Sequence, residues 1–140
     1  PPRIDGRSVD FGALLRQESE LADFAYRWSH FRDADDPPAL PQLPCWQTYL
    51  EAPGKALIAE HLHESAMYGG AIGARGPRYC PSVEDKIVRF PEAVRHQLFL
   101  EPEGLDTSEL YVNGLSTSLP APVQLAVLRT VRGLERAVMT

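Results

Sequence analysis

The chain has 140 residues, of which 44% are hydrophobic and 24% are charged, and it carries a formal net charge of −5. This composition is typical of one soluble globular domain, and no apolar run approaches the ~18 residues that indicate a membrane span. Two cysteines without metal-ligand spacing argue against a disulfide scaffold or a zinc site and fit a reducing, cytoplasmic setting.

The first forty residues are expected to hold an extended segment, a helix and a loop. Alternating charges around Ile4 and Val9 favour an extended stretch over residues 1–11. Apolar residues at roughly helical intervals predict a helix over 14–30. Residues 33–44 contain four prolines and three aspartates, so we expect a surface loop there.

The next elements are a strand, a helix and a glycine-rich loop. Residues 45–50 read as a short strand, and Pro53-Gly54 as a turn that leads into a helix over 55–65. The buried face of that helix is expected to carry Leu57, Ile58, His61 and Leu62. Gly69 to Gly76 contains four glycines, but it lacks the strand-GxGxxG-helix arrangement of a dinucleotide fold.

The last third of the chain predicts a small β-meander and a helix. Strands are expected at 97–101 and 109–112, and Asn113-Gly114 is a hairpin signal, so the meander covers 97–118. A helix is expected over 122–132, with an apolar stripe of Val123, Ala126, Val127, Thr130 and Val131 and a stop at Gly133. Together these elements predict an α+β fold, a small antiparallel sheet with short helices.

One cysteine could carry chemistry. Ser82 and Asp85 match the start of a capping box, so a helix is expected to begin there. Cys80 would then lie near the positive end of that helix and near Arg78, and both effects favour the thiolate. A small buried residue in a tight loop is the alternative interpretation of Cys80.

The remaining polar residues do not indicate a metal site. His61 and His63 are two positions apart, so on a helix they point away from each other and cannot share one ion. Residues 71–100 carry more basic than acidic side chains, which would suit a phosphate-bearing ligand, and a solvated mixed face explains the same pattern.

Long sequence blocks resemble a known family, the flavoprotein subunit of the tRNA uridine-5-carboxymethylaminomethyl modification enzyme, also called glucose-inhibited division protein A. The blocks that carry the resemblance are residues 1–7, Asp10-Phe11, Pro44-Cys45, Met67-Tyr68, 76–90, 96–104 and 111–120. They follow the family order over nearly the whole chain.

The resemblance implies that residues 1–140 form one insertion domain of a longer, glutathione-reductase-like flavoprotein, with residues 1–11 as the strand leaving the flavin domain. The family adds a carboxymethylaminomethyl or aminomethyl group at C5 of the tRNA wobble uridine. It uses FAD, bound mainly outside this segment, together with NADH and methylenetetrahydrofolate. The implied partners are tRNA, a GTPase subunit and a second copy of the full-length protein.

The resemblance also places nicotinamide-dinucleotide binding on residues 76–90 and a candidate catalytic thiol at Cys80. The residues so implied are Gly76, Pro77, Arg78, Tyr79, Cys80, Pro81, Ser82, Val83, Glu84, Asp85, Lys86, Ile87, Val88, Arg89 and Phe90. Arg78, Lys86 and Arg89 could neutralise a pyrophosphate, and free N–H groups are expected at the helix start. The alternative is a non-catalytic module that docks tRNA or the GTPase partner.

Overall fold

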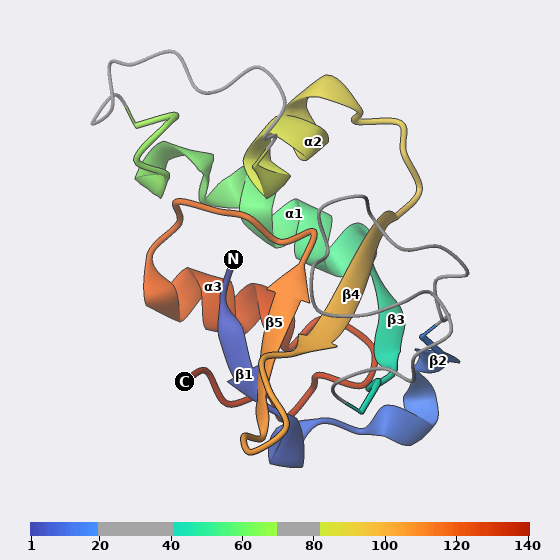
Figure 1. Cartoon of the computed structure of the whole chain (residues 1–140). Coiled ribbons are helices and arrows are strands. Elements are labelled where there is room, and N and C mark those ends of the chain that lie inside the picture. The colour runs from blue at the N-terminus through green and yellow to red at the C-terminus, as the bar shows by residue number, and fades with distance from the viewer. Residues whose placement is uncertain (20–40, 70–81) are drawn as a thin grey trace, which may run out of the picture.

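A computed structural model describes residues 1–19, 41–69 and 82–140. Within them, five strands form one antiparallel sheet in the order β1-β5-β4-β3-β2 (Figure 1). The strands are β1 (Arg3–Asp5), β2 (Leu15–Gln17), β3 (Cys45–Leu50), β4 (His96–Pro102) and β5 (Glu109–Asn113). The helices are α1 (Ala52–Glu60), α2 (Val83–Arg89) and α3 (Ala121–Leu128). The predicted α+β class is confirmed.

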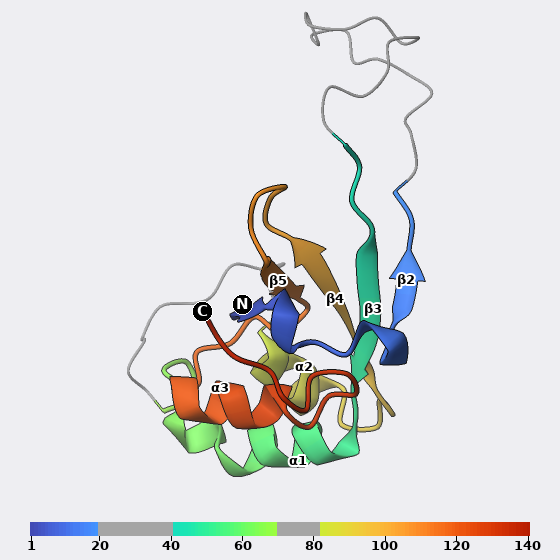
Figure 2. The ribbon, with the colours of Figure 1, turned by 90° about the horizontal axis from the view of Figure 1, so that it is seen from below.

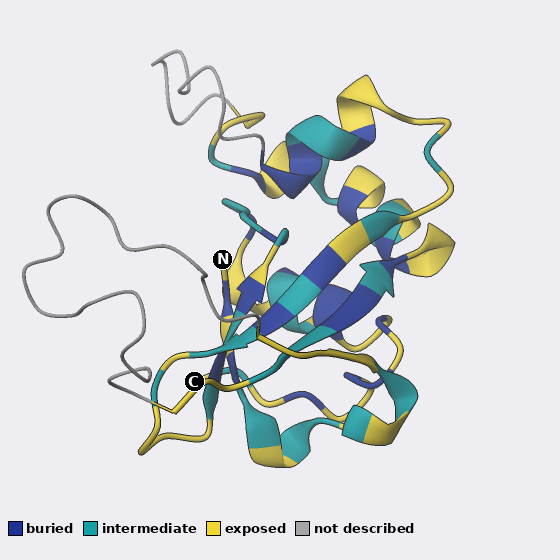
Figure 3. Ribbon diagram, turned by 45° about the vertical axis from the view of Figure 1, so that its right-hand side comes forward, coloured by how far each residue is buried: buried dark blue, intermediate teal, exposed yellow. Residues whose placement is uncertain are grey.

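The sheet is amphipathic because successive side chains of a strand point to opposite faces. Leu98 and Leu100 of β4 are fully buried, whereas the intervening residues are half-buried or exposed, and Figure 3 shows this alternation along the strand. Register keeps the buried residues on one face, since Leu100 pairs with Val112 of β5, which is also fully buried. The short strands 45–50, 97–101 and 109–112 are confirmed within one or two residues.

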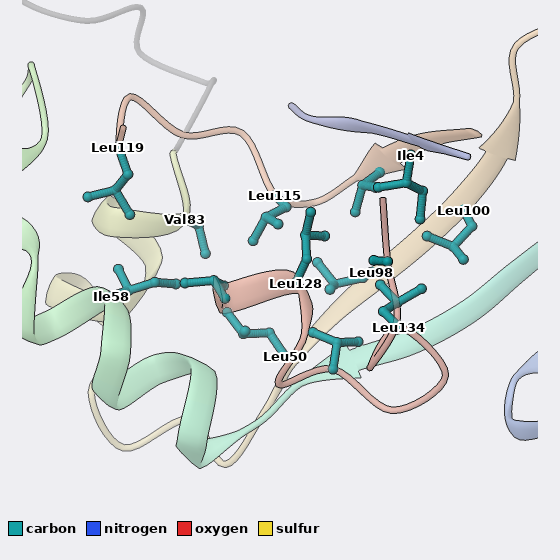
Figure 4. Close-up of a cluster of buried hydrophobic side chains, with 14 of the residues drawn as sticks. Ile4, Leu50, Ile58, Val83, Leu98, Leu100, Leu115, Leu119, Leu128 and Leu134 are labelled. Carbon is teal, nitrogen blue, oxygen red and sulfur yellow. The ribbon is translucent and has the colours of Figure 1, made fainter. Parts of the chain in front are cut away.

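Helices α1 and α3 lie side by side on the apolar face of the sheet (Figures 1 and 2). Ile58 of α1 and Leu128 of α3 are fully buried, and they join Leu50 and Leu98 in one core (Figure 4). Truncating such a side chain to alanine costs about 2–5 kcal/mol, because the surroundings close only partly over the cavity. The core therefore fixes both helices on the sheet.

The two ends of the described chain lie next to each other at the β1 edge of the sheet (Figure 2). The amide of Thr140 donates to the carbonyl of Arg3 at 3.1 Å, and the amide of Asp5 donates to the carbonyl of Val138 at 2.9 Å. Ile4 also forms a bridge with Met139. The first and last strand-forming residues thus lie side by side.

Three expectations for the first half of the chain need correction. Leu15–Gln17 is a strand rather than the start of a helix over 14–30, because Leu15 pairs with Gln47 at the sheet edge. Pro53-Gly54 is not a turn before a helix. Both residues belong to the first turn of α1, where proline's missing N–H costs nothing. Of the expected extended segment 1–11, only Arg3–Asp5 is strand, followed by two 3-10 turns.

Other expected helices are shorter than predicted. α1 ends at Glu60 and gives way to a 3-10 turn at Leu62–Glu64; Ile58 is buried on it, whereas Leu57, His61 and Leu62 are only half-buried. α3 ends at Leu128, and the expected stripe is partly wrong, since Ala126 and Thr130 are exposed while Leu128 is buried. Residues 20–40 and 70–81, which include most of the expected loop 33–44, lie outside the described residues.

The hairpin expected at Asn113-Gly114 does not form. Gly114 has the positive φ (95°) that the dipeptide signals, but no strand follows it within 115–118. Strands β4 and β5 are joined instead through residues 103–108 and pair antiparallel. The segment 115–118 is held by α2, because the carbonyl of Ser116 accepts from the amide of Val83 at 2.6 Å.

The backbone conformation of Gly133 and its close contacts can be tested by substitution. Its φ of 85° suits only glycine without strain, and an added Cβ would lie 2.6 Å from Leu14 Cδ2 and 3.0 Å from Asp10 O. We expect Gly133→Ala to lower the free energy of unfolding by more than about 1 kcal/mol, the cost of the left-handed conformation alone. Urea unfolding of the chain measures this.

Gly104→Ala is the matched control, because a Cβ there makes only an ordinary contact, 3.6 Å from Thr107 Cγ2. Its unfolding free energy should stay within about 0.5 kcal/mol of the parent. Equal stability of the two variants would contradict the described backbone at Gly133.

Candidate functional site

Helix α2 lies in the described part, residues 82–90, of the segment on which the family resemblance places dinucleotide binding. Ser82 is its N-cap, and its Oγ accepts from the amide of Asp85 at 3.2 Å, which confirms the predicted cap. Acidic residues occupy the first turn and basic residues the last turn, as the helix dipole favours. Val83 and Ile87 are buried in the core, so the helix has one fixed face.

Glu84, in the first turn of α2, has a fully buried carboxylate. Its Oε1 accepts from Ser65 Oγ at 3.1 Å, Thr117 Oγ1 at 3.0 Å and the amide of Ser118 at 3.0 Å, with Ser118 Oγ at 3.3 Å. The other oxygen, Oε2, is buried and accepts no hydrogen bond within the described residues. One carboxylate oxygen therefore joins three segments of the chain.

Tyr68 forms a second link between α2 and the preceding segment. Its hydroxyl donates to Asp85 Oδ1 at 2.7 Å, and Arg89 Nε lies 3.8 Å from the same oxygen. The hydrogen bond to Asp85, with burial adding to it, raises the pKa of Tyr68 to about 12. The Asp85 carboxylate thus holds a phenol and a guanidinium on the outer side of the helix.

Lys86 is the half-buried cation of the helix. Its Nζ donates to the carbonyl of Gly114 at 2.9 Å, and burial lowers its pKa. The pKa of His96 is also lowered, first by burial and then by the charges of Lys55 and Lys86. Lys86 has no carboxylate partner among the described residues, so its charge is uncompensated there.

The structure divides the predicted site residues into four groups. Gly76, Pro77, Arg78, Tyr79, Cys80 and Pro81 lie outside the described residues. Ser82, Val83, Glu84 and Ile87 are buried. Asp85 and Lys86 are half-buried, and Val88, Arg89 and Phe90 are exposed. Only the last two groups present side chains to a ligand from α2.

At the start of α2, three backbone N–H groups already have acceptors within the chain. The amide of Val83 donates to Ser116 O, the amide of Asp85 to Ser82 Oγ and the amide of Lys86 to Ser82 O. These donors are satisfied within the chain, so the start of α2 offers fewer free N–H groups to a phosphate than expected.

Sequence reasoning missed the residues that support α2 from outside the helix. These are Ser65, Tyr68, Thr117 and Ser118, which bond to Glu84 or Asp85, and Gly114, which accepts from Lys86. The blocks Met67-Tyr68 and 111–120 that carry the family resemblance contain four of the five. Their joint role was hidden because they meet only in the folded chain.

The environment of Cys45 disfavours its thiolate form. It is free and half-buried at the start of β3, and burial, followed by the nearby charge of Glu101, raises its pKa. A raised pKa leaves less thiolate at neutral pH. His61 bonds to Glu64 at 2.6 Å, and no group of metal-binding side chains gathers in residues 1–19, 41–69 and 82–140.

Comparison with known proteins identifies close relatives over the full length of this chain. The model of a family described as glucose inhibited division protein A matches residues 1–140. "tRNA uridine 5-carboxymethylaminomethyl modification enzyme MnmG" of Chlamydia muridarum is 50% identical over 141 residues, covering 100% of this chain and 22% of the relative. The protein of that name from Bacillus mycoides is 48% identical over 139 residues, covering 99% and 21%.

A solved structure has the same fold. The crystal structure of Aquifex aeolicus GidA in crystal form I superposes with a TM-score of 0.80 at 47% identity, covering 99% of this chain and 24% of that one. Crystal form II gives a TM-score of 0.77 at 42% identity, with 99% and 22% covered. The chain thus spans about one fifth to one quarter of the length of the proteins it matches.

The Tyr68–Asp85 hydrogen bond makes a pH-dependent prediction. Because the folded pKa of Tyr68 is raised above its ordinary 10.0 to about 12, this bond stabilises the fold fully below pH 10 and is lost as pH rises through about 12. We expect Asp85→Asn to lower the pKa of Tyr68 toward 10.0.

The near-ultraviolet absorbance of tyrosinate, recorded during an alkaline titration, measures this pKa. Tyr68→Phe in the same titration identifies the contribution of Tyr68 among the five tyrosines. A Tyr68 titration that is the same with Asp85 and with Asn at that position would contradict the assigned hydrogen bond.

Proposed function

The chain belongs to the glucose inhibited division protein A family, and from this membership we propose that it is one part of an FAD- and NADH-dependent enzyme that modifies tRNA. The proposed reaction adds a carboxymethylaminomethyl or aminomethyl group at C5 of the wobble uridine, with methylenetetrahydrofolate as carbon donor. Its relatives are named as tRNA uridine 5-carboxymethylaminomethyl modification enzymes. Because the chain spans about one fifth of them, the activity is proposed for the whole protein.

Within that protein we assign this chain to an insertion beside the flavin domain. The assignment is supported by the share of its relatives that this chain spans, about one fifth of their length. The GTPase subunit, a second copy of the flavoprotein and a cytoplasmic location are proposed with the family. None of the described helices is long and apolar enough to cross a membrane.

The proposed share of this chain is to contact the nicotinamide dinucleotide through α2. The observation that carries the proposal is Lys86, a half-buried cation that is held by the Gly114 carbonyl and has no carboxylate partner in the described residues. A desolvated cation attracts a phosphate more strongly than a solvated one. Arg89 lies on the same helix and is exposed.

These residues fit a dinucleotide through its charge and its flat rings. Lys86 and Arg89 would neutralise the pyrophosphate, and the exposed ring of Phe90 offers an apolar surface beside them. The dinucleotide would supply reducing equivalents to the flavin, which is bound mainly outside this chain. Buried Val83 and Ile87 hold α2 against the core and would keep the two cations in place.

Cys80 is proposed as the thiol that acts on the uracil ring, as a nucleophile or proton donor. It lies two residues before the Ser82 cap in the sequence. The competing proposal is that the chain only docks tRNA or the GTPase partner, with Cys80 structural.

Lys86→Gln in the full-length flavoprotein tests the dinucleotide contact. Glutamine keeps a donor for the Gly114 carbonyl but removes the charge. We expect the KM for NADH in flavin reduction to rise about tenfold, the effect of one charge-assisted hydrogen bond of about 1.5 kcal/mol, while tRNA affinity changes less. Stopped-flow reduction of the flavin and a tRNA binding titration measure the two quantities.

Arg16→Gln is the control for this comparison, because Arg16 is an exposed cation on edge strand β2. It should leave the KM for NADH unchanged. If Lys86→Gln weakens tRNA binding while the KM for NADH stays constant, α2 belongs to the RNA surface instead.

Cys80→Ser in the full-length enzyme tests the thiol. Acid–base or nucleophilic groups contribute factors of 10² or more, so turnover of tRNA should fall by roughly 100-fold or more, with flavin reduction by NADH intact. Cys45→Ser replaces a free thiol with a raised pKa and should leave turnover unchanged. Unchanged turnover by folded Cys80→Ser would favour the docking module.

A further inference from the structure

The carboxylate of Glu84 is a junction of three chain segments. Its Oε1 accepts from Ser65, which follows the 3-10 turn after α1, and from Thr117 and Ser118, which follow β5. Glu84 itself stands in the first turn of α2. Ser65, itself buried, bonds both to Glu84 and to Ser118, so it belongs to the same junction.

Further hydrogen bonds align the same three segments around Glu84. Ser65 Oγ lies 2.7 Å from Ser118 Oγ, and the amide of Ala66 donates to the carbonyl of Ser118 at 3.4 Å. On the other side, the amide of Val83 donates to Ser116 O at 2.6 Å. The described residues on either side of positions 70–81 are therefore both attached to segment 116–118.

Stability alone does not explain a carboxylate at this position. Glu84 is fully buried, its Oε1 takes every donor, and its Oε2 takes none from the described residues. Burying a charge with an unsatisfied oxygen is costly, and apolar replacements of buried charges are often neutral or stabilising. What this carboxylate does provide is a fixed geometry, because several donors from separate segments must meet at one atom.

The geometry fixed by Glu84 includes the position of Lys86. Lys86 stands two residues later on α2, and its Nζ donates to Gly114, in the segment that continues to Thr117 and Ser118. Any shift of α2 against segment 114–118 would move the ammonium group relative to its carbonyl partner. Such a shift would weaken the attraction between this ammonium group and a phosphate of the ligand.

We infer that Glu84 is a positioning residue, which fixes α2 on segments 65–66 and 116–118 and thereby sets where Lys86 meets the dinucleotide. Glu84 is buried and does not contact the ligand itself. The inference rests on the proposed function, in which α2 binds NADH.

Two substitutions in the full-length flavoprotein test the inference through the split between KM and kcat. Glu84→Gln keeps an amide oxygen for the same donors, so the KM for NADH should stay close to the parent value. Glu84→Ala removes the junction, so this KM should rise about tenfold or more, while flavin reduction at saturating NADH keeps most of its rate. A purely structural residue would lower the thermal midpoint without moving the KM of the folded enzyme.

Thr48→Val is the matched control. Thr48 is also buried, and its Oγ1 donates to the carbonyl of Arg132 at 3.0 Å. It lies on strand β3, far from α2 in the sequence. It should lower the thermal midpoint and leave the KM for NADH unchanged. An equal rise of KM in Thr48→Val and Glu84→Ala would overturn the inference, and so would an unchanged KM in folded Glu84→Ala.

The inference would also be overturned if Glu84→Gln raised the KM for NADH as much as Glu84→Ala does. That result would mean that the charge of Glu84 matters, rather than the hydrogen bonds that its oxygen accepts. Should Glu84→Ala fail to fold, Thr117→Val removes one donor and should raise the KM for NADH, and no rise would count against the inference. Lys86→Gln separates the two proposals: if it raises KM and Glu84→Ala does not, only the positioning role fails. If Lys86→Gln itself has no effect, the proposed dinucleotide contact fails.

Discussion

The hydrogen bonds that converge on Glu84 Oε1 are the interaction on which the candidate site depends. Helix α2 has only seven residues, and a helix that short has little stability of its own in water. Buried Val83 and Ile87 give it a face on the core, but an apolar contact leaves room to slide or turn. The directional bonds of Glu84 and the Ser82 cap remove that freedom, so the outward side chains of α2 have defined positions.

Much of the sheet could be predicted because the residue pattern within a strand is itself enough to indicate that strand. Strand β4 alternates buried and more exposed residues, which is the period of an antiparallel strand with one covered face. Strand β2 could not be predicted, since the apolar spacing from Leu14 onward also fits a helix and the pairing of Leu15 with Gln47 decides the outcome. Similarly, Gly114 adopts the positive φ that Asn-Gly signals. No hairpin forms, because the segment after Gly114 is hydrogen-bonded to α2 instead.

The candidate site divides in the same way. The Ser82 cap could be predicted because its partner, Asp85, is three residues away. Glu84 was included only as a member of a family block, and nothing local shows that it is buried, since its donors lie 19, 33 and 34 positions away. The sequence could not show that the first N–H of α2 is taken, because its acceptor, Ser116, is distant in sequence.

The central claim is that the outer surface of α2 contacts the nicotinamide dinucleotide within a flavin-dependent tRNA-modifying protein. Hydrogen–deuterium exchange of the full-length flavoprotein, with and without NADH, tests it most directly, because it reports on the backbone without any substitution. The account predicts slower exchange on adding NADH in peptides that cover 82–90 and 114–118, and no change in β2. Exchange in those two peptides that is unaffected by NADH but slowed by tRNA would contradict it.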